Sequence, residues 1–250
     1  MFGKNKTLPA TYGEKSKASA EEKAGEVLEV NSIFYTIQGE GPYAGQPAVF
    51  VRLTGCNLKC WFCDTEFETG DMRNVDSVVA TVRELAGKVC DLVVLTGGEP
   101  MRQQITRLCE ILIGEEFTVQ IETAGTLWPE GDLENLVGRG GVSIVCSPKT
   151  PKVHELVERH CHHYKYIMQE YDSAKDGLPS RSTQVQGKSA RVFRPSDPAA
   201  VIWVQPCFEY DREHADDVSS NRANMIKCVD TAKQHGYRVS LQQHKIMGVE

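Results

Sequence analysis

An alternation of short apolar runs with stretches of helical periodicity constrains the fold of this chain more than any other feature. The apolar runs, which have the length of buried strands, are residues 29–35, 48–53, 91–96, 117–122, 142–147, 164–170, 201–205 and 237–242. Helical spacing of apolar residues predicts helices over 76–89, 105–112, 133–137, 154–160 and 220–235. Strands that alternate with helices favour a parallel sheet with helical crossovers. Of these eight runs, about six or seven follow the strand–helix order, fewer than the eight strands of a closed barrel, so we predict an α/β fold that is an incomplete barrel.

A loop directly after the run 48–53 carries three cysteines, Cys56, Cys60 and Cys63. A structural zinc site normally completes its shell with a fourth Cys or His at a matching spacing, and this loop has none. A [4Fe-4S] cluster is usually held by four cysteine thiolates. A cluster held by this loop would therefore keep one iron open for another ligand. A zinc-binding interaction module is the non-enzymatic alternative.

Polar residues and glycines follow most of the predicted strands. In parallel α/β folds the ligand lies beyond the carboxyl ends of the strands, so residues placed there are expected to share one site. These residues are Gln38 and Glu40, the cysteine loop, Thr96 to Glu99, Glu122 to Gly125, Ser147 to Lys149, and Gln205. We therefore predict a single site that combines the cysteines with carboxylates and backbone-exposing glycines.

The charge of the chain argues against two classes of partner. A net charge of −6, with no basic run or basic helix face, gives no electrostatic reason to bind nucleic acid or an anionic membrane. No apolar stretch approaches the ~18 residues of a membrane span, and the N-terminus lacks the apolar region of a secretory signal. We expect a cytoplasmic protein that acts on small molecules. In a reducing compartment the remaining cysteines are expected to be small buried hydrophobes: Cys90, Cys109, Cys146, Cys161, Cys207 and Cys228.

Two segments do not follow the alternating pattern. Residues 1–25 lack apolar periodicity and are predicted to be a flexible arm before a single domain over 26–250. Residues 171–198 are rich in Ser, Gln, Arg, Gly and Pro and are predicted to be an irregular insertion, with a lid or a partner contact as its possible roles. The histidines at 160–163, interrupted by Cys161, are interpreted as a helix end and not as a second metal site, because they lack partners at ligand spacing.

Several motifs taken together resemble one enzyme family. They are Gln38-Gly39-Glu40-Gly41, Arg52-Leu53-Thr54-Gly55-Cys56, Cys63-Asp64-Thr65, Thr96-Gly97-Gly98-Glu99-Pro100, Ile121-Glu122-Thr123, Ser147-Pro148-Lys149 and Gln243-His244-Lys245. The CxxxCxxC spacing alone resembles only the radical S-adenosylmethionine (SAM) superfamily. The full set, from about residue 29 to 250, is similar to the 7-carboxy-7-deazaguanine synthases. Another small radical SAM enzyme, such as a glycyl-radical activase, is the alternative, although the Gln38 to Gly41 turn and the C-terminal motif argue against it.

The resemblance implies a homodimer with a truncated TIM-like βα barrel of the radical SAM type. Its implied reaction converts 6-carboxy-5,6,7,8-tetrahydropterin to 7-carboxy-7-deazaguanine with release of ammonia, in 7-deazapurine (queuosine) biosynthesis. The implied cofactors are a [4Fe-4S] cluster, SAM and Mg2+. A reductase or flavodoxin-type protein would supply the electron.

The resemblance also implies roles for individual residues. Cys56, Cys60 and Cys63 would hold the cluster, and Thr65 would ligate Mg2+. The residues implied for SAM are Phe62, Cys63, Asp64, Gly98, Ser147, Pro148 and Lys149, with Glu122 and Gln205 as further candidates for SAM or substrate. Those implied for the substrate are Ile37, Gln38, Gly39, Arg52 and Thr96. No general base is assigned, because the hydrogen transfers belong to the SAM-derived radical.

Overall fold

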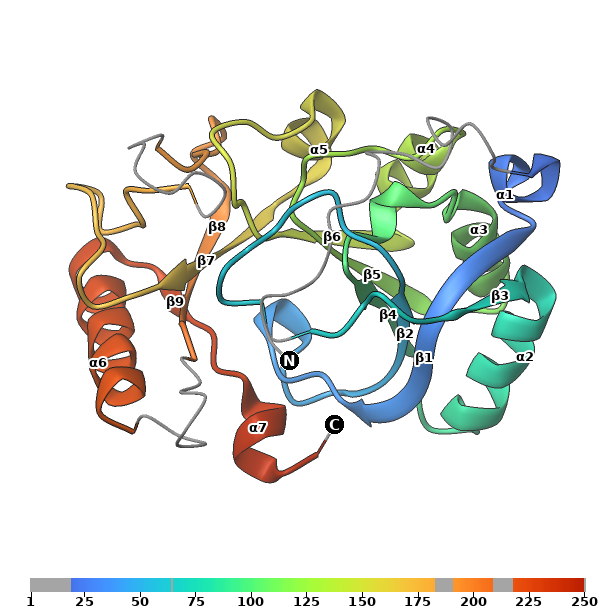
Figure 1. Cartoon of the computed structure of the whole chain (residues 1–250), viewed down its shortest axis with the longest axis horizontal. Coiled ribbons are helices and arrows are strands. Elements are labelled where there is room, and N and C mark those ends of the chain that lie inside the picture. The colour runs from blue at the N-terminus through green and yellow to red at the C-terminus, as the bar shows by residue number, and fades with distance from the viewer. Residues whose placement is uncertain (1–18, 64, 183–190, 209–217, 250) are drawn as a thin grey trace.

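The structure is a computed structural model, and it describes residues 19–63, 65–182, 191–208 and 218–249 (Figure 1). The strands are β1 (Val27–Ile37), β2 (Pro47–Leu53), β3 (Asp71–Asn74), β4 (Leu92–Gly97), β5 (Thr118–Thr123), β6 (Val142–Cys146), β7 (His163–Met168), β8 (Val201–Pro206) and β9 (Arg238–Val239). The α-helices are α1 (Ala20–Ala24), α2 (Val75–Ala86), α3 (Thr106–Gly114), α4 (Leu133–Gly138), α5 (Glu155–His160), α6 (Val218–His235) and α7 (Gln243–Met247). Short 3-10 helices cover Gly41–Tyr43 and Pro100–Arg102.

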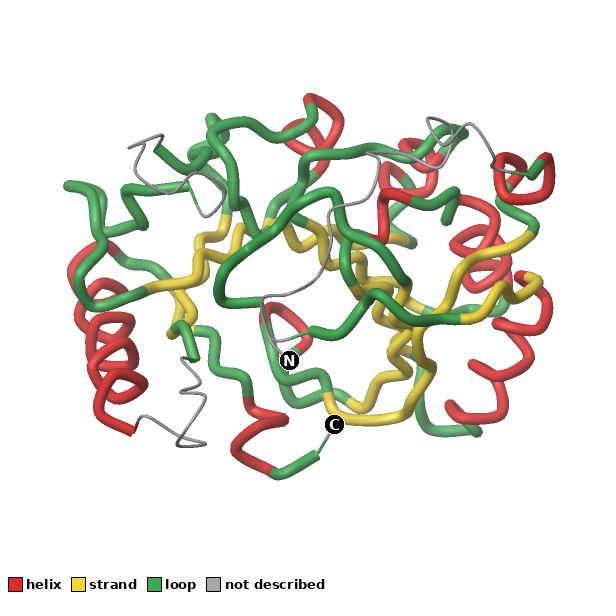
Figure 2. Tube along the Cα trace, in the orientation of Figure 1, coloured by secondary structure: helices red, strands yellow, loops and turns green. Residues whose placement is uncertain are grey.

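The described strands form one nine-stranded sheet in the order β3-β1-β2-β4-β5-β6-β7-β8-β9. From β2 to β9 every neighbouring pair is parallel. The strands curve into an open arc with α2 to α6 on its outer side, and loops cross the space that the arc encloses (Figure 2). The prediction of an α/β incomplete barrel is confirmed.

Strand β1 departs from the expected parallel order, because it runs antiparallel to both β2 and β3. The connection from β1 to β2 spans only residues 38–46, and a parallel crossover needs a dozen or more residues. A segment this short can only return the chain antiparallel. The sequence pattern also missed β3, a polar edge strand with the sequence Asp-Met-Arg-Asn, because charged residues that protect a sheet edge lack strand periodicity.

The core lies between the sheet and the outer helices. Helix α2 buries Val75, Val78, Val79 and Val82 against it, and each fully buried valine contributes about 1.5–3 kcal/mol. The side chain of Asn74 caps this helix by accepting a hydrogen bond from the Asp76 amide at 2.8 Å. All six cysteines outside the loop are buried, as predicted. No helix among the described residues is long and apolar enough to cross a membrane.

The two irregular segments are only partly described. In the predicted arm, residues 1–18 lie outside the described residues and Ala20–Ala24 form an exposed helix with a Ser19 capping box. In the predicted insertion, residues 183–190 lie outside the description and the described remainder contains no helix or strand. Asp176 joins its two described parts by accepting hydrogen bonds from Arg194 at 2.8 and 3.1 Å. The Arg194 guanidinium also lies 5.3 Å from the Tyr166 ring of β7, so this part of the insertion packs on the barrel.

Candidate active site

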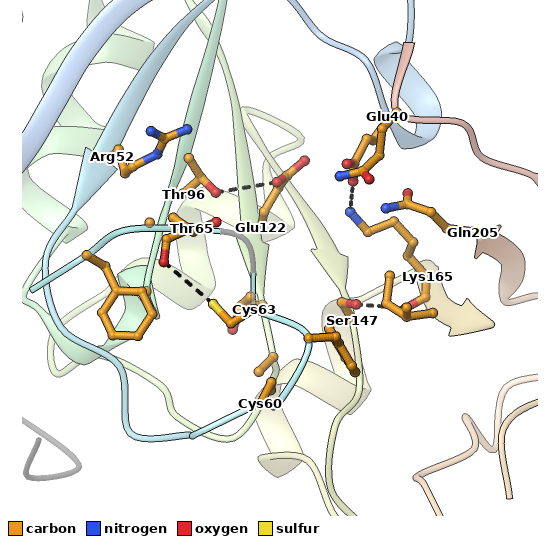
Figure 3. Close-up of a pocket in the computed structure, with 18 of the residues that line it drawn as sticks. Glu40, Arg52, Cys60, Cys63, Thr65, Thr96, Glu122, Ser147, Lys165 and Gln205 are labelled. Carbon is orange, nitrogen blue, oxygen red and sulfur yellow. Dashed lines mark hydrogen bonds and ion pairs between the residues drawn. The ribbon is translucent and has the colours of Figure 1, made fainter. Parts of the chain in front are cut away.

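A cavity of about 370 Å³ lies at the carboxyl ends of the parallel strands (Figure 3). Its walls include most of the residues singled out from the sequence: Ile37, Gln38, Arg52, Cys56, Cys60, Phe62, Cys63, Thr65, Thr96, Gly98, Glu122, Ser147, Lys149 and Gln205. Gly39 and Pro148 do not line it, and Asp64 lies outside the described residues. Residues distributed over 168 positions of sequence, from Ile37 to Gln205, therefore meet in one cavity.

The three loop cysteines all face this cavity. Cys56 is buried, whereas Cys60 and Cys63 are half-buried, and the Cys63 thiol donates to the Thr65 carbonyl at 3.6 Å. No three Cys, His, Asp or Glu side chains in the described part of the chain are close enough to hold a single metal ion. A [4Fe-4S] cluster does not require that, because each thiolate binds a different iron. Burial raises the pKa of the Cys56 thiol to about 12, so the cations of a cluster would be needed to stabilise its thiolate.

The two glycines after β4 allow its end to pack against the cysteine loop. Gly97 has φ +127°, which favours glycine, and a Cβ atom on Gly98 would lie 2.2 Å from the Gly55 carbonyl oxygen. The Gly98 amide donates to Leu53 O at 3.2 Å, and the Glu99 amide donates to Gly55 O at 2.9 Å. The sequence suggested that these glycines make room for a ligand. The structure shows that these glycines are required for close contact between two backbone segments of the protein, the end of β4 and the start of the cysteine loop.

Glu99 does not line the cavity, although the sequence placed it among the residues expected to share one site. Its buried carboxylate accepts hydrogen bonds from the Thr123 hydroxyl at 2.7 Å, the Ala124 amide at 2.8 Å and the Met101 amide at 3.1 Å. Burial raises the pKa of this carboxyl, and the three hydrogen bonds offset the increase only in part. Glu99 therefore ties the end of β4 to the loop after β5.

Replacing Glu99 with glutamine is expected to lower the free energy of unfolding by about 1–3 kcal/mol, because an amide NH2 group would face one of the three donors. Chemical denaturation of the purified protein measures this. Glu84→Gln, an exposed change on α2, is the matched control and should leave stability within about 0.5 kcal/mol of the unmodified protein. Equal stability of the two variants would show that Glu99 does not hold these segments together.

Glu122 on β5 is the centre of a polar network inside the cavity. One carboxylate oxygen accepts hydrogen bonds from Gln38 Nε2 at 3.1 Å and Gln120 Nε2 at 3.0 Å. The other accepts from the Thr96 hydroxyl at 3.4 Å (Figure 3). Its own strand β5, strand β4 and the turn after β1 thus hold the carboxylate in place.

Arg52 on β2 carries a guanidinium group into the same cavity. Its Cζ atom lies 5.0 Å from the centre of the Phe34 ring, and Phe34 stacks on Phe50 at 5.4 Å. The Nε atom is buried and has no hydrogen-bond partner among the described residues. A buried donor without a partner costs about 1–3 kcal/mol, so an anionic ligand at Arg52 would remove that penalty.

Lys149, in the segment after β6, also lines the cavity. Its ammonium group donates to the Ser147 carbonyl at 2.8 Å and lies 6.0 Å from the Phe62 ring of the cysteine loop. Desolvation lowers the pKa of Lys149 below its ordinary value. The residues expected to contact SAM after β6 and in the cysteine loop are therefore neighbours in space.

The structure adds residues to the cavity that sequence reasoning did not assign. They include Phe34, Phe50, Lys165, Ile167, Gln242, His244 and Lys245. Lys165 could have been singled out from the sequence, because a charged residue inside an otherwise apolar strand is rarely buried without a partner. The C-terminal residues were marked in the sequence only by a motif. Nothing in their spacing indicates which part of the barrel they contact.

Comparisons with known proteins agree with this geometry. Residues 50–180 match the family model described as the Radical SAM superfamily. A 7-carboxy-7-deazaguanine synthase of Rhodospirillum rubrum is 38% identical over 254 residues, covering 100% of both chains. One of Rickettsia prowazekii is 37% identical over 249 residues, covering 96% of each. The crystal structure of QueE from Escherichia coli has the same fold, with a TM-score of 0.61, 22% identity, and coverage of 89% of this chain and 99% of that one.

Both kinds of sequence match extend over the site described above. The family model spans the cysteine loop, the glycines after β4 and the segment after β6, and the two relatives extend the match over essentially the whole chain. Together with the cavity that gathers these motifs, this shows that the chain belongs to the 7-carboxy-7-deazaguanine synthase family of the radical SAM superfamily.

Proposed function

We propose that this protein converts 6-carboxy-5,6,7,8-tetrahydropterin to 7-carboxy-7-deazaguanine with release of ammonia, in 7-deazapurine biosynthesis. The observation that carries the proposal is the gathering of the family motifs around one cavity of about 370 Å³. Ligand pockets for small molecules typically have volumes of about 300–1,000 Å³. A cavity of this kind suits a pterin better than the protein segment that a glycyl-radical activase must bind.

Membership of the radical SAM superfamily implies a [4Fe-4S] cluster and SAM. Cys56, Cys60 and Cys63 fit a three-thiolate ligand set, since all three line the cavity. When bound, the cluster supplies the electron that cleaves SAM. Binding and orientation of SAM are proposed for the cysteine loop, Gly98 and the segment after β6, with Glu122 and Gln205 as further contacts. The sequence resemblance also assigns Asp64 and Pro148 to SAM.

The substrate is proposed to bind on the side of the cavity formed by Arg52, Thr96 and the segment 37–39. The Arg52 guanidinium can form two parallel hydrogen bonds to a carboxylate, and its Nε atom is among the donors available for them. Thr65 is proposed to bind Mg2+ through its hydroxyl. A single protein oxygen is sufficient, because Mg2+ usually keeps several waters and takes further oxygens from its substrate.

Replacing Thr65 with alanine is expected to lower turnover by about 10- to 100-fold and to change its dependence on Mg2+, because one metal ligand is lost. Titration of the reaction rate with Mg2+ measures the effect, and binding of SAM should change less. Thr69→Ala, in the same loop but outside the cavity, is the control. An unchanged Mg2+ profile for Thr65→Ala would contradict the ligand role.

The proposed function is tested by anaerobic turnover of the carboxypterin with SAM and a chemical reductant. The product 7-carboxy-7-deazaguanine and ammonia are expected in equal amounts. No product from protein that contains an intact cluster would refute the proposal. A colourless, zinc-loaded protein would instead support a zinc-binding module.

We further propose that the protein is a cytoplasmic homodimer. We also propose that it takes its electron from a reductase or flavodoxin-type protein. Light scattering tests the dimer, and reconstitution with such a donor tests the source of the electron.

A further inference from the structure

A buried ion pair lies at one end of the cavity. Lys165, in the middle of β7, contacts the Glu40 carboxylate, and the two side chains are 8% and 10% exposed (Figure 3). Burial raises the pKa of Glu40, but the charge and hydrogen bond of Lys165, together with a hydrogen bond from Gln242 and the charge of His244, outweigh this and hold the pKa below its ordinary value. Removing one partner of such a pair costs far more than removing both, because a single buried charge has no compensation.

The pair is joined to the proposed substrate-binding segment by direct hydrogen bonds. The Glu40 amide donates to Gln38 Oε1 at 3.0 Å, and Gln38 Nε2 donates to Glu122 at 3.1 Å. Glu122 in turn accepts from Thr96 at 3.4 Å. A continuous chain of contacts therefore leads from β7 through the turn after β1 to β5 and β4, across the width of the cavity.

The C-terminal segment closes the same turn from the other side. The Gln243 amide donates to Gly39 O at 3.2 Å, and the Gly41 amide donates to the Ser240 hydroxyl at 3.2 Å. A Cβ atom on Gly39 would lie 2.2 Å from His244 Nδ1, so only glycine allows this contact. The turn that follows β1 is thus held between β7 and the C-terminal segment.

We propose that the Glu40–Lys165 ion pair is a positioning device for the carboxypterin, which fixes the backbone of residues 37–39 and, through Gln38, the Glu122 carboxylate. This inference rests on the proposed function for the identity of the substrate. Lys165 and Glu40 act through other residues, because their opposite charges are directed at each other. The cysteine loop, where SAM is proposed to bind, has no part in the chain of hydrogen bonds from Glu40 to Thr96. In the segment after β6, the Ser147 hydroxyl donates to the Lys165 carbonyl at 2.9 Å, a backbone contact that is kept when the Lys165 side chain is replaced. Of the two further candidates for SAM, Glu122 is held by this chain, and in this inference its carboxylate acts on the substrate. The pair therefore sets the affinity for the substrate and leaves that for SAM nearly unchanged.

Steady-state kinetics of the cluster-containing protein test this role. Lys165→Met is expected to raise the KM for carboxypterin by about 10- to 100-fold, since small displacements of positioning groups have effects of this size. The dissociation constant of SAM should stay within about twofold. Glu40→Gln is the second single variant, and Arg83→Met, which breaks the exposed Arg83–Glu115 ion pair, is the matched control with unchanged KM. The double variant Glu40→Gln/Lys165→Met should recover part of the loss, because no unpaired charge is left.

Hydrogen exchange of the backbone amides gives a measurement that does not depend on the substrate. Lys165→Met should accelerate exchange in residues 38–45 and 240–243, and the double variant should restore part of the protection. Unchanged exchange, an unchanged KM, strictly additive effects in the double variant, or an equal rise in the SAM dissociation constant would each overturn the inference. If the unmodified protein does not turn over carboxypterin, the proposed function is wrong, and the exchange data still decide whether the ion pair positions the turn.

Discussion

Replacing Cys60 with alanine is expected to abolish reductive cleavage of SAM and to leave the fold intact. Cys60 is half-buried in a loop that faces the cavity, so the lost thiol leaves no large void in the core. A [4Fe-4S] cluster held by three thiolates has no spare protein ligand, and loss of one should reduce bound iron well below about four atoms per chain. Iron analysis, the visible spectrum and the formation of 5′-deoxyadenosine under anaerobic conditions measure these effects.

Cys90→Ala provides the matched control for this experiment. Cys90 is a buried cysteine that does not line the cavity, so its loss should lower stability without changing iron content or SAM cleavage. Circular dichroism of both variants separates loss of the cluster from loss of the fold. A Cys60→Ala protein that still cleaves SAM would contradict the assignment of the three loop cysteines.

The second large effect is expected at Arg52. Replacing it with methionine removes the two charge-assisted hydrogen bonds proposed for the substrate carboxylate, each of about 1.5–3 kcal/mol, and should lower kcat/KM for carboxypterin by roughly 100-fold or more. Arg52→Lys keeps the charge but loses the planar fork and its packing on Phe34, so it should recover only a small part of the activity. Steady-state kinetics with saturating SAM measure both variants.

Arg73→Met is the control for the Arg52 variants, because the Arg73 guanidinium lies outside the cavity and donates hydrogen bonds to Ser77 and Thr81 of α2. It should leave kcat/KM unchanged. Cleavage of SAM without substrate should also continue in Arg52→Met. If Arg52→Met retains full kcat/KM, the substrate carboxylate binds elsewhere and the proposed orientation of the pterin is wrong.

The strands and helices show which parts of the fold local sequence patterns can predict. Apolar runs of strand length and helical spacing are local properties, and the predicted parallel strands and their crossover helices were confirmed to within a few residues. The direction of β1 was wrong in the prediction because it depends on the length of its connection to β2. Strand β3 was missed because its exposed, polar residues give no hydrophobic pattern.

Among the site residues, the sequence by itself determined which motifs follow which strands, and the rule that ligands lie at the carboxyl ends of parallel strands was enough to bring together the motifs after β2, β4, β5, β6 and β8. The rule does not account for Gln38 and Glu40, because they follow the antiparallel β1, whose end pairs with the start of β2. Only the tertiary structure decided how each side chain is directed. Glu99 stands in a motif beside the cavity, yet its carboxylate binds the loop after β5. Glu40 and Lys165 are 125 positions apart, and the C-terminal segment reaches Gly39 from the far end of the chain. Contacts of this kind depend on how the sheet curves and closes, a property that no local spacing of residues encodes.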